Sequence, residues 1–134
     1  MLFSCSEKEV SNHKNSAKKH KNPYYEKAFV FLDKNEQDSA FYYLNKGKDL
    51  FTKLDDSLGI GKSYVNMAII QETTGDNFGS IESSITASKF LKENDTTHYQ
   101  SVFCNYNNLA VASNNLKNYN NAKRFYDKAL HFTK

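Results

Sequence analysis

The sequence predicts an all-α protein made of three helix-turn-helix repeats, and both composition and internal similarity support this prediction. Only five Gly and one Pro occur among 134 residues, whereas a sheet protein needs turn residues at each chain reversal. Aromatic residues make up 14% of the chain, and a disordered chain would be poor in them. A segment of helix-turn-helix length also recurs three times. We therefore expect one packed helical domain.

The repeat is defined by an aromatic residue and three small residues at fixed distances. The aromatic residue comes four positions before the first small residue, the second small residue follows twelve positions later, and the third seven after that. The unit recurs after 40 and then 42 residues, and this agreement over three copies indicates a repeat architecture. The copies are Tyr24, Ala28, Ala40 and Gly47; Tyr64, Ala68, Ser80 and Ala87; and Tyr106, Ala110, Ala122 and Ala129.

Helix packing explains why small residues recur. Two antiparallel helices approach closely only where both side chains are small, so we expect the first and second small residues of each copy to face each other, as Ala68 and Ser80 would. We expect the aromatic residue to fill the wider gap at the open end of the hairpin. The third small residue, such as Gly47, should make room for the next hairpin.

The elements follow in order as six helices with short polar turns. The turns fall at 34–36, 74–76 and 117–118, where Gly75 suits a helix C-terminus and Asp76 an N-cap. We expect two helical stripes to pack in the core, one of Phe78, Ile81, Ile85, Ser88, Phe90 and Leu91 and one of Phe125, Tyr126, Leu130 and Phe132. The expected helices are 22–34, 37–54, 60–74, 77–93, 97–116 and 119–132.

The repeat pattern resembles the tetratricopeptide repeat. The third copy is the most similar, and the first departs from the pattern with Lys27 where Leu is usual. The late Pro is absent, and the period exceeds the usual 34 residues. The resemblance implies a right-handed α-α superhelix with repeats at about 22–55, 62–95 and 104–134. The matching residues of the third copy are Tyr106, Leu109, Ala110, Tyr119, Ala122, Tyr126, Ala129 and Leu130.

The same resemblance implies that the first helix of each unit lines a concave groove, in which the family holds peptides or partner helices. Asn side chains there offer donors and an acceptor to a peptide backbone. The sequence thus predicts a protein-interaction scaffold; the alternative is a sensory or regulatory segment of a longer bacterial protein. We expect the array either to continue in a longer protein or to form a homodimer through its last hairpin, because no polar cap follows it. The predicted groove residues are Tyr25, Phe29, Leu32, Val65, Ile69, Glu72, Asn107, Val111 and Asn114.

The positive charge lies outside the predicted repeats. Residues 1–22 contain five Lys and two Glu, which account for the net charge of +3 and leave the remainder neutral. A nucleic-acid partner would require a basic folded face, so we expect none. Residues 1–21 are interpreted as a flexible basic tether to the 22–134 array. The run before Cys5 resembles a bacterial lipobox, which would lipidate Cys5 and place the protein at the cell envelope; an ordinary cytoplasmic terminus is the alternative.

Motifs that resemble catalytic or metal sites lack residues or spacings that those sites require. Residues 59–63 (GIGKS) resemble the end of a phosphate-binding loop. However, Asp56 stands where that motif requires Gly, and a helix is expected before the run where the motif requires a strand. The four His residues share no metal-ligand spacing with one another. We therefore expect no enzyme activity, no cofactor and no metal.

Overall fold

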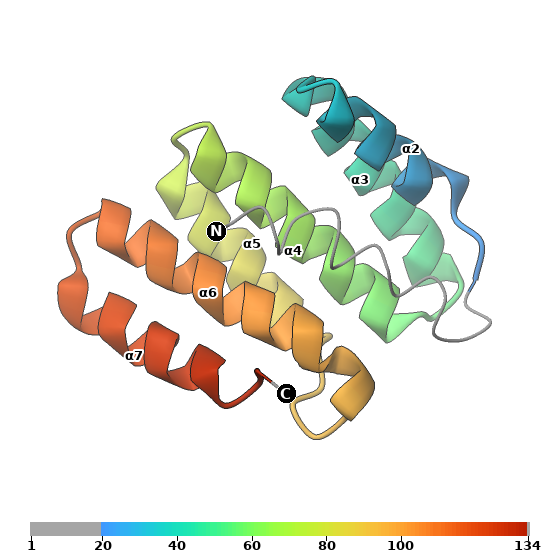
Figure 1. Ribbon diagram of the computed structural model, residues 1–134. Coiled ribbons are helices and arrows are strands. Elements are labelled where there is room, and N and C mark those ends of the chain that lie inside the picture. Colours follow the sequence, from blue (N-terminus) through green and yellow to red (C-terminus); the bar gives the residue numbers. More distant parts are fainter. Residues whose placement is uncertain (1–19, 134) are drawn as a thin grey trace.

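The computed structural model describes residues 20–133, in which six α-helices pack in chain order as antiparallel pairs (Figure 1). This confirms the all-α class and the six expected helices. A short 3-10 helix, η3 (Thr96–His98), precedes the fifth of them. The helices are α2 (Pro23–Asp33), α3 (Gln37–Lys53), α4 (Ser57–Thr73), α5 (Asn77–Ser88), α6 (Tyr99–Asn115) and α7 (Tyr119–Leu130).

Side-chain caps decide where the helices begin and end. Asp76 accepts a hydrogen bond from the Gly79 amide at 2.9 Å, as expected for an N-cap. Asp56 does the same for Gly59 at 2.9 Å, so α4 begins three residues before the predicted position 60. The helix predicted to reach residue 93 ends at Ser88, since His98 Nδ1 accepts the Lys92 amide at 3.0 Å and this bond holds the chain in a loop.

The turns inside the three hairpins share one backbone conformation. Asn35, Gly75 and Lys117 occupy equivalent positions and have φ of 60°, 97° and 66°. A left-handed residue after the last helical turn lets the chain reverse while the carbonyls of that turn remain hydrogen-bonded. The three predicted turns are therefore confirmed.

All nine small residues of the repeat are buried. In the second hairpin the Ser80 hydroxyl donates to the Ala68 carbonyl at 2.8 Å, so these two residues face each other as predicted. The prediction for Gly47 was wrong. A Cβ there would lie 3.0 Å from the Tyr25 amide nitrogen of its own hairpin, and Asn22 donates to the Gly47 carbonyl at 2.9 Å; Gly47 thus makes room for α2 and not for the next hairpin.

The recurring Tyr closes the open end of two hairpins. Tyr64 stacks on Phe90 with ring centroids 6.2 Å apart. The equivalent pair in the third hairpin, Tyr106 and Phe132, is 6.1 Å apart. This agrees with the predicted role of the aromatic position.

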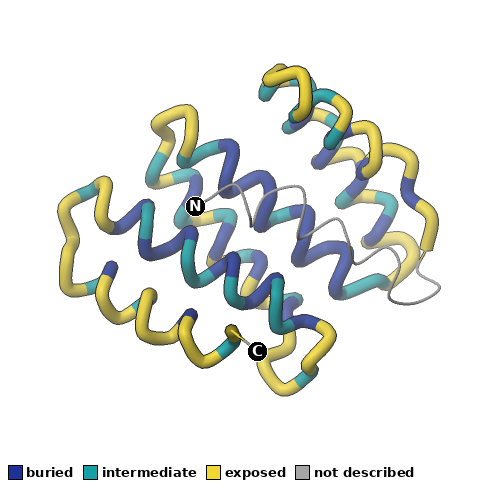
Figure 2. The backbone as a smooth tube through the Cα atoms, in the orientation of Figure 1, coloured by how far each residue is buried: buried dark blue, intermediate teal, exposed yellow. Residues whose placement is uncertain are grey.

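The core consists of two apolar clusters that meet at α4. One joins α2, α3 and α4, and the other joins α4, α5 and α6; accordingly α4 is buried along most of its length, whereas α7 is largely exposed (Figure 2). None of the described helices is long and apolar enough to cross a membrane.

The two predicted apolar stripes were only partly core, and this prediction was wrong for several residues. On α5, Phe78 is 75% exposed and Ile85 53% exposed. The buried face of α5 consists instead of Ser80, Ser84 and Ala87, because these small side chains allow α4 and α6 to approach. On α7 the same holds for Tyr126 and Leu130, which are exposed.

Candidate functional site

The first helices of the three hairpins, α2, α4 and α6, are linked to one another. Tyr25 on α2 accepts a hydrogen bond from Asn66 Nδ2 on α4 at 3.4 Å. Near the C-terminal end of α4, Glu72 Oε2 accepts a hydrogen bond from Asn115 Nδ2 on α6 at 2.9 Å. We call the side of these three helices that carries the predicted groove residues the first-helix face.

Three of the predicted groove residues lie in the core. Val65 is fully buried and packs with Ile69, which is 8% exposed, in the cluster around α4, α5 and α6. Tyr25 is 7% exposed and makes edge-on ring contacts with Phe29 at 5.0 Å and Phe51 at 5.3 Å. These buried residues hold the face together and offer little surface to a partner.

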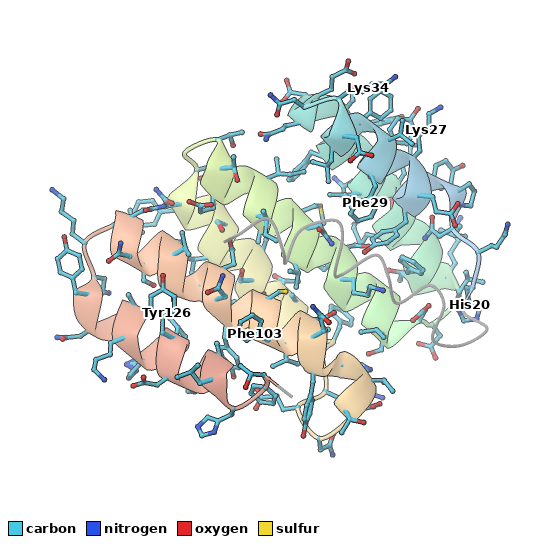
Figure 3. The ribbon with its side chains drawn as sticks, in the orientation of Figure 1. His20, Lys27, Phe29, Lys34, Phe103 and Tyr126 are labelled. Carbon is cyan, nitrogen blue, oxygen red and sulfur yellow. The ribbon has the colours of Figure 1, made fainter. Side chains whose placement is uncertain are left out.

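The apolar surface of the first-helix face comes from half-buried side chains. Phe29 and Leu32 on α2 pack against the cluster that includes α4 residues, and both keep part of their surface exposed. Phe29 lies on the side of α2 toward α4 (Figure 3). Val111 on α6 is also half-buried.

The polar surface lies mainly on α6. Asn107 is half-buried and Asn114 is exposed, and neither amide forms a side-chain hydrogen bond with the described residues. Asn115 differs, because its amide is held by Glu72 and by Asn77 Oδ1 at 3.0 Å. Asn107 and Asn114 thus have donors and acceptors available for a partner, while Asn115 and Glu72 connect the helices.

The electrostatics of the site come from a buried phenol with a cation nearby. Burial raises the pKa of the Tyr25 hydroxyl above its usual value of about 10. The Lys62 ammonium lies 6.0 Å from the centre of the Tyr25 ring, within range of a cation–π contact. Tyr25 therefore remains neutral at physiological pH and acts as a hydrogen-bonding core residue.

The run that resembled a phosphate-binding loop has a packing role. It lies within the first turns of α4. A Cβ at Gly59 would lie 2.5 Å from the Phe51 ring, and one at Gly61 would overlap Leu91. Both glycines are thus explained by close contact between α4 and its neighbours.

Among residues 20–133 we find no group of His, Cys, Asp and Glu side chains placed to hold a metal ion. Cys104 is buried in the core. The predicted lipidation site, Cys5, lies outside the described residues.

Comparisons with protein-family models, curated proteins and solved structures gave no match for this chain.

Exposed apolar side chains on the second helices were missed by the sequence analysis. The helical spacing of Phe78 and Ile85 suggested a core stripe, yet both are exposed on α5. The available signal was the repeat itself, because the small residues Ser80 and Ala87 had already defined the buried face of α5. The α5 helix buries the side whose small residues fit its neighbours, and its larger apolar side chains remain exposed.

Proposed function

We propose that this chain is a tetratricopeptide-like interaction module that binds a peptide or a partner helix on its first-helix face. The observation that carries the proposal is the pair of unbonded amides, Asn107 and Asn114, on the same side of α6 as the half-buried Val111. Such amides can pair with the backbone of a bound segment. Across α4, Phe29 and Leu32 supply apolar surface, and each Å² of apolar surface that a partner covers contributes about 25 cal/mol.

The charge distribution supports an apolar ligand instead of a charged one. Residues 23–134 carry equal numbers of basic and acidic side chains, so the array lacks the net charge that steers charged partners. Affinity should therefore depend weakly on salt. The ligand class that fits is a segment with one or two large apolar side chains and a free backbone edge.

The experiment begins with peptides selected for binding from a random display library. The tightest peptide is titrated into the isotopically labelled full chain, and amide shifts are followed by NMR. We expect the largest shifts on α2, α4 and α6. Shifts confined to α3, α5 and α7 would refute the proposal.

A matched pair of variants tests the amides directly. The double variant Asn107→Ala with Asn114→Ala should weaken peptide binding about tenfold or more, because two hydrogen bonds of about 1 kcal/mol each are lost. The control is Asn45→Ala with Asn120→Ala, which removes two exposed amides from α3 and α7 and should leave affinity unchanged. Equal effects of the two double variants would contradict the assignment.

A further inference from the structure

The exposed side of α7 is equivalent to the side of α5 that packs against α6. Residues of α7 correspond to residues of α5 that lie 42 positions earlier. Tyr119, Tyr126 and Leu130 form what we call the α7 end face, and they are 61%, 41% and 65% exposed. Their equivalents on α5 are Asn77, Ser84 and Ser88.

Each of these α5 residues is bonded to α6. Asn115 Nδ2 donates to Asn77 Oδ1 at 3.0 Å. Asn108 Nδ2 donates to the Ser84 hydroxyl at 3.1 Å, and Asn105 Nδ2 donates to the Ser88 hydroxyl at 3.0 Å. The α7 end face is therefore the position at which the first helix of a following hairpin would dock, and no described helix covers it.

The opposite end of the molecule has the complementary surface. On α2 an exposed side carries Glu26, Val30 and Asp33, which we call the α2 end face; Val30 is 49% exposed. Val30 is equivalent to Ile70 of α4, which is buried in the cluster that includes α3 residues. The α2 end face thus corresponds to the side of α4 that packs on the preceding hairpin.

The residue chemistry of the two end faces is complementary. Glu26 is equivalent to Asn108, and Asp33 to Asn115. If α2 docked on α7 as α6 docks on α5, Glu26 would face Tyr126, and Asp33 would face Tyr119, so each phenol could donate a hydrogen bond to a carboxylate. Figure 3 shows Tyr126 and Lys27 at opposite ends of the array.

Net charge favours the same pairing. Residues 22–38, which include α2 and the start of α3, carry four acidic and two basic side chains, a net charge of −2. Residues 117–133 carry four basic and one acidic side chain, a net charge of +3. Two α7 faces would repel each other, whereas α2 and α7 attract.

We infer that a second copy of this chain docks its α2 end face on the α7 end face of the first, so that copies stack head to tail and continue the repeat order. In an open chain of copies, this contact leaves a free α2 end face at one end and a free α7 end face at the other. Such a heterologous contact builds a chain of copies or a ring, unlike a symmetric dimer. The inference stands independently of the peptide-binding proposal, because it uses different surfaces.

Two variants of the full chain, each altered at one face, test this inference. The first is Tyr126→Glu with Leu130→Glu, and the second is Glu26→Lys with Val30→Lys. The control, Phe78→Glu with Ile85→Glu, alters two exposed apolar residues of α5 outside both faces. Molecular mass is measured by sedimentation velocity over a range of protein concentrations, and the helical spectrum of each variant is compared with that of the parent.

The expected results follow from the head-to-tail direction of the contact, which joins two different faces. The parent and the control should grow beyond a dimer as concentration rises, and their association should weaken with salt. Each face variant alone should remain a monomer. An equimolar mixture of the two face variants should form a heterodimer and stop there, because one intact contact remains; this result also shows that both variants are folded.

Three outcomes would overturn the inference. The parent could remain a monomer at every concentration. The second variant alone could still dimerise, which would show a symmetric α7 contact. The mixture could remain monomeric although both variants keep the native helical spectrum.

Discussion

Small residues decide how closely the two helices of a hairpin approach, and a single methylene group is significant there. Ala68 is fully buried, and its carbonyl accepts the Ser80 hydroxyl at 2.8 Å, which leaves no space for a larger side chain. We expect Ala68→Leu to lower the free energy of unfolding by about 1–3 kcal/mol through overpacking. Chemical denaturation measures this change. The control Glu82→Leu, on the exposed side of α5, should change it by less than about 0.5 kcal/mol.

Because the phenol of Tyr25 is buried, we expect the stability of the folded chain to fall as pH rises in the alkaline range. Its pKa is raised by burial, so the folded chain keeps a proton that the unfolded chain releases above about pH 10. The stability that this group contributes is complete below about pH 10 and is lost as pH rises further. The free energy of unfolding of the Tyr25→Phe variant should therefore fall less steeply with pH than that of the parent between about pH 9 and pH 11. Tyr42→Phe, at a 55% exposed ring, is the matched control, and a slope for Tyr25→Phe equal to that of the parent would contradict this account.

Turn chemistry sets the ends of the helices, and the three hairpins provide an internal comparison. Gly75 has φ of 97°, whereas Lys117 adopts φ of 66° at the equivalent position with a side chain that disfavours it. Lys117→Gly should therefore raise the free energy of unfolding by about 0.5–1 kcal/mol, because the strain that is relieved exceeds the extra backbone entropy that Gly loses on folding. Lys123→Gly, in the interior of α7, should lower it by about 1 kcal/mol. Thermal melting checks both signs, and a loss of stability in Lys117→Gly would contradict the strain argument.

The sequence predicted the helices and turns better than it predicted the surfaces. Spacing identified the small residues that are buried in every hairpin, because close helix contacts admit few residue types. It did not identify Val65 as core, since a residue on a first helix can point toward either the groove or a neighbouring helix. Nor did spacing show that Phe78 and Ile85 are exposed. Burial of an apolar stripe depends on what packs against it, and this depends on tertiary structure.

For the whole molecule, the two contacts between successive hairpins differ in chemistry at equivalent positions. Between α3 and α4, Leu44 and Ile70 belong to a buried apolar cluster. Their equivalents 40 and 42 positions later, at the contact between α5 and α6, are Ser84 and Ala112. Buried oxygens without a hydrogen-bond partner also occur here, including Asn108 Oδ1, and such groups cost free energy.

This difference predicts that the third hairpin opens before the rest. In a repeat array, stability is approximately the sum of each unit and its contacts with its neighbours, and α7 has a described neighbour on one side only. Native-state hydrogen exchange should show amides of α6 and α7 opening at a free energy at least about 1 kcal/mol below those of α3 and α4, because Ser84 and Ala112 bury fewer apolar carbon atoms than Leu44 and Ile70. Leu44→Ser would make the first contact resemble the second and should bring the two values together. If the amides of all four helices open at one common free energy in the parent, the array unfolds as a single unit. This result would contradict the prediction that the polar contact between α5 and α6 opens first.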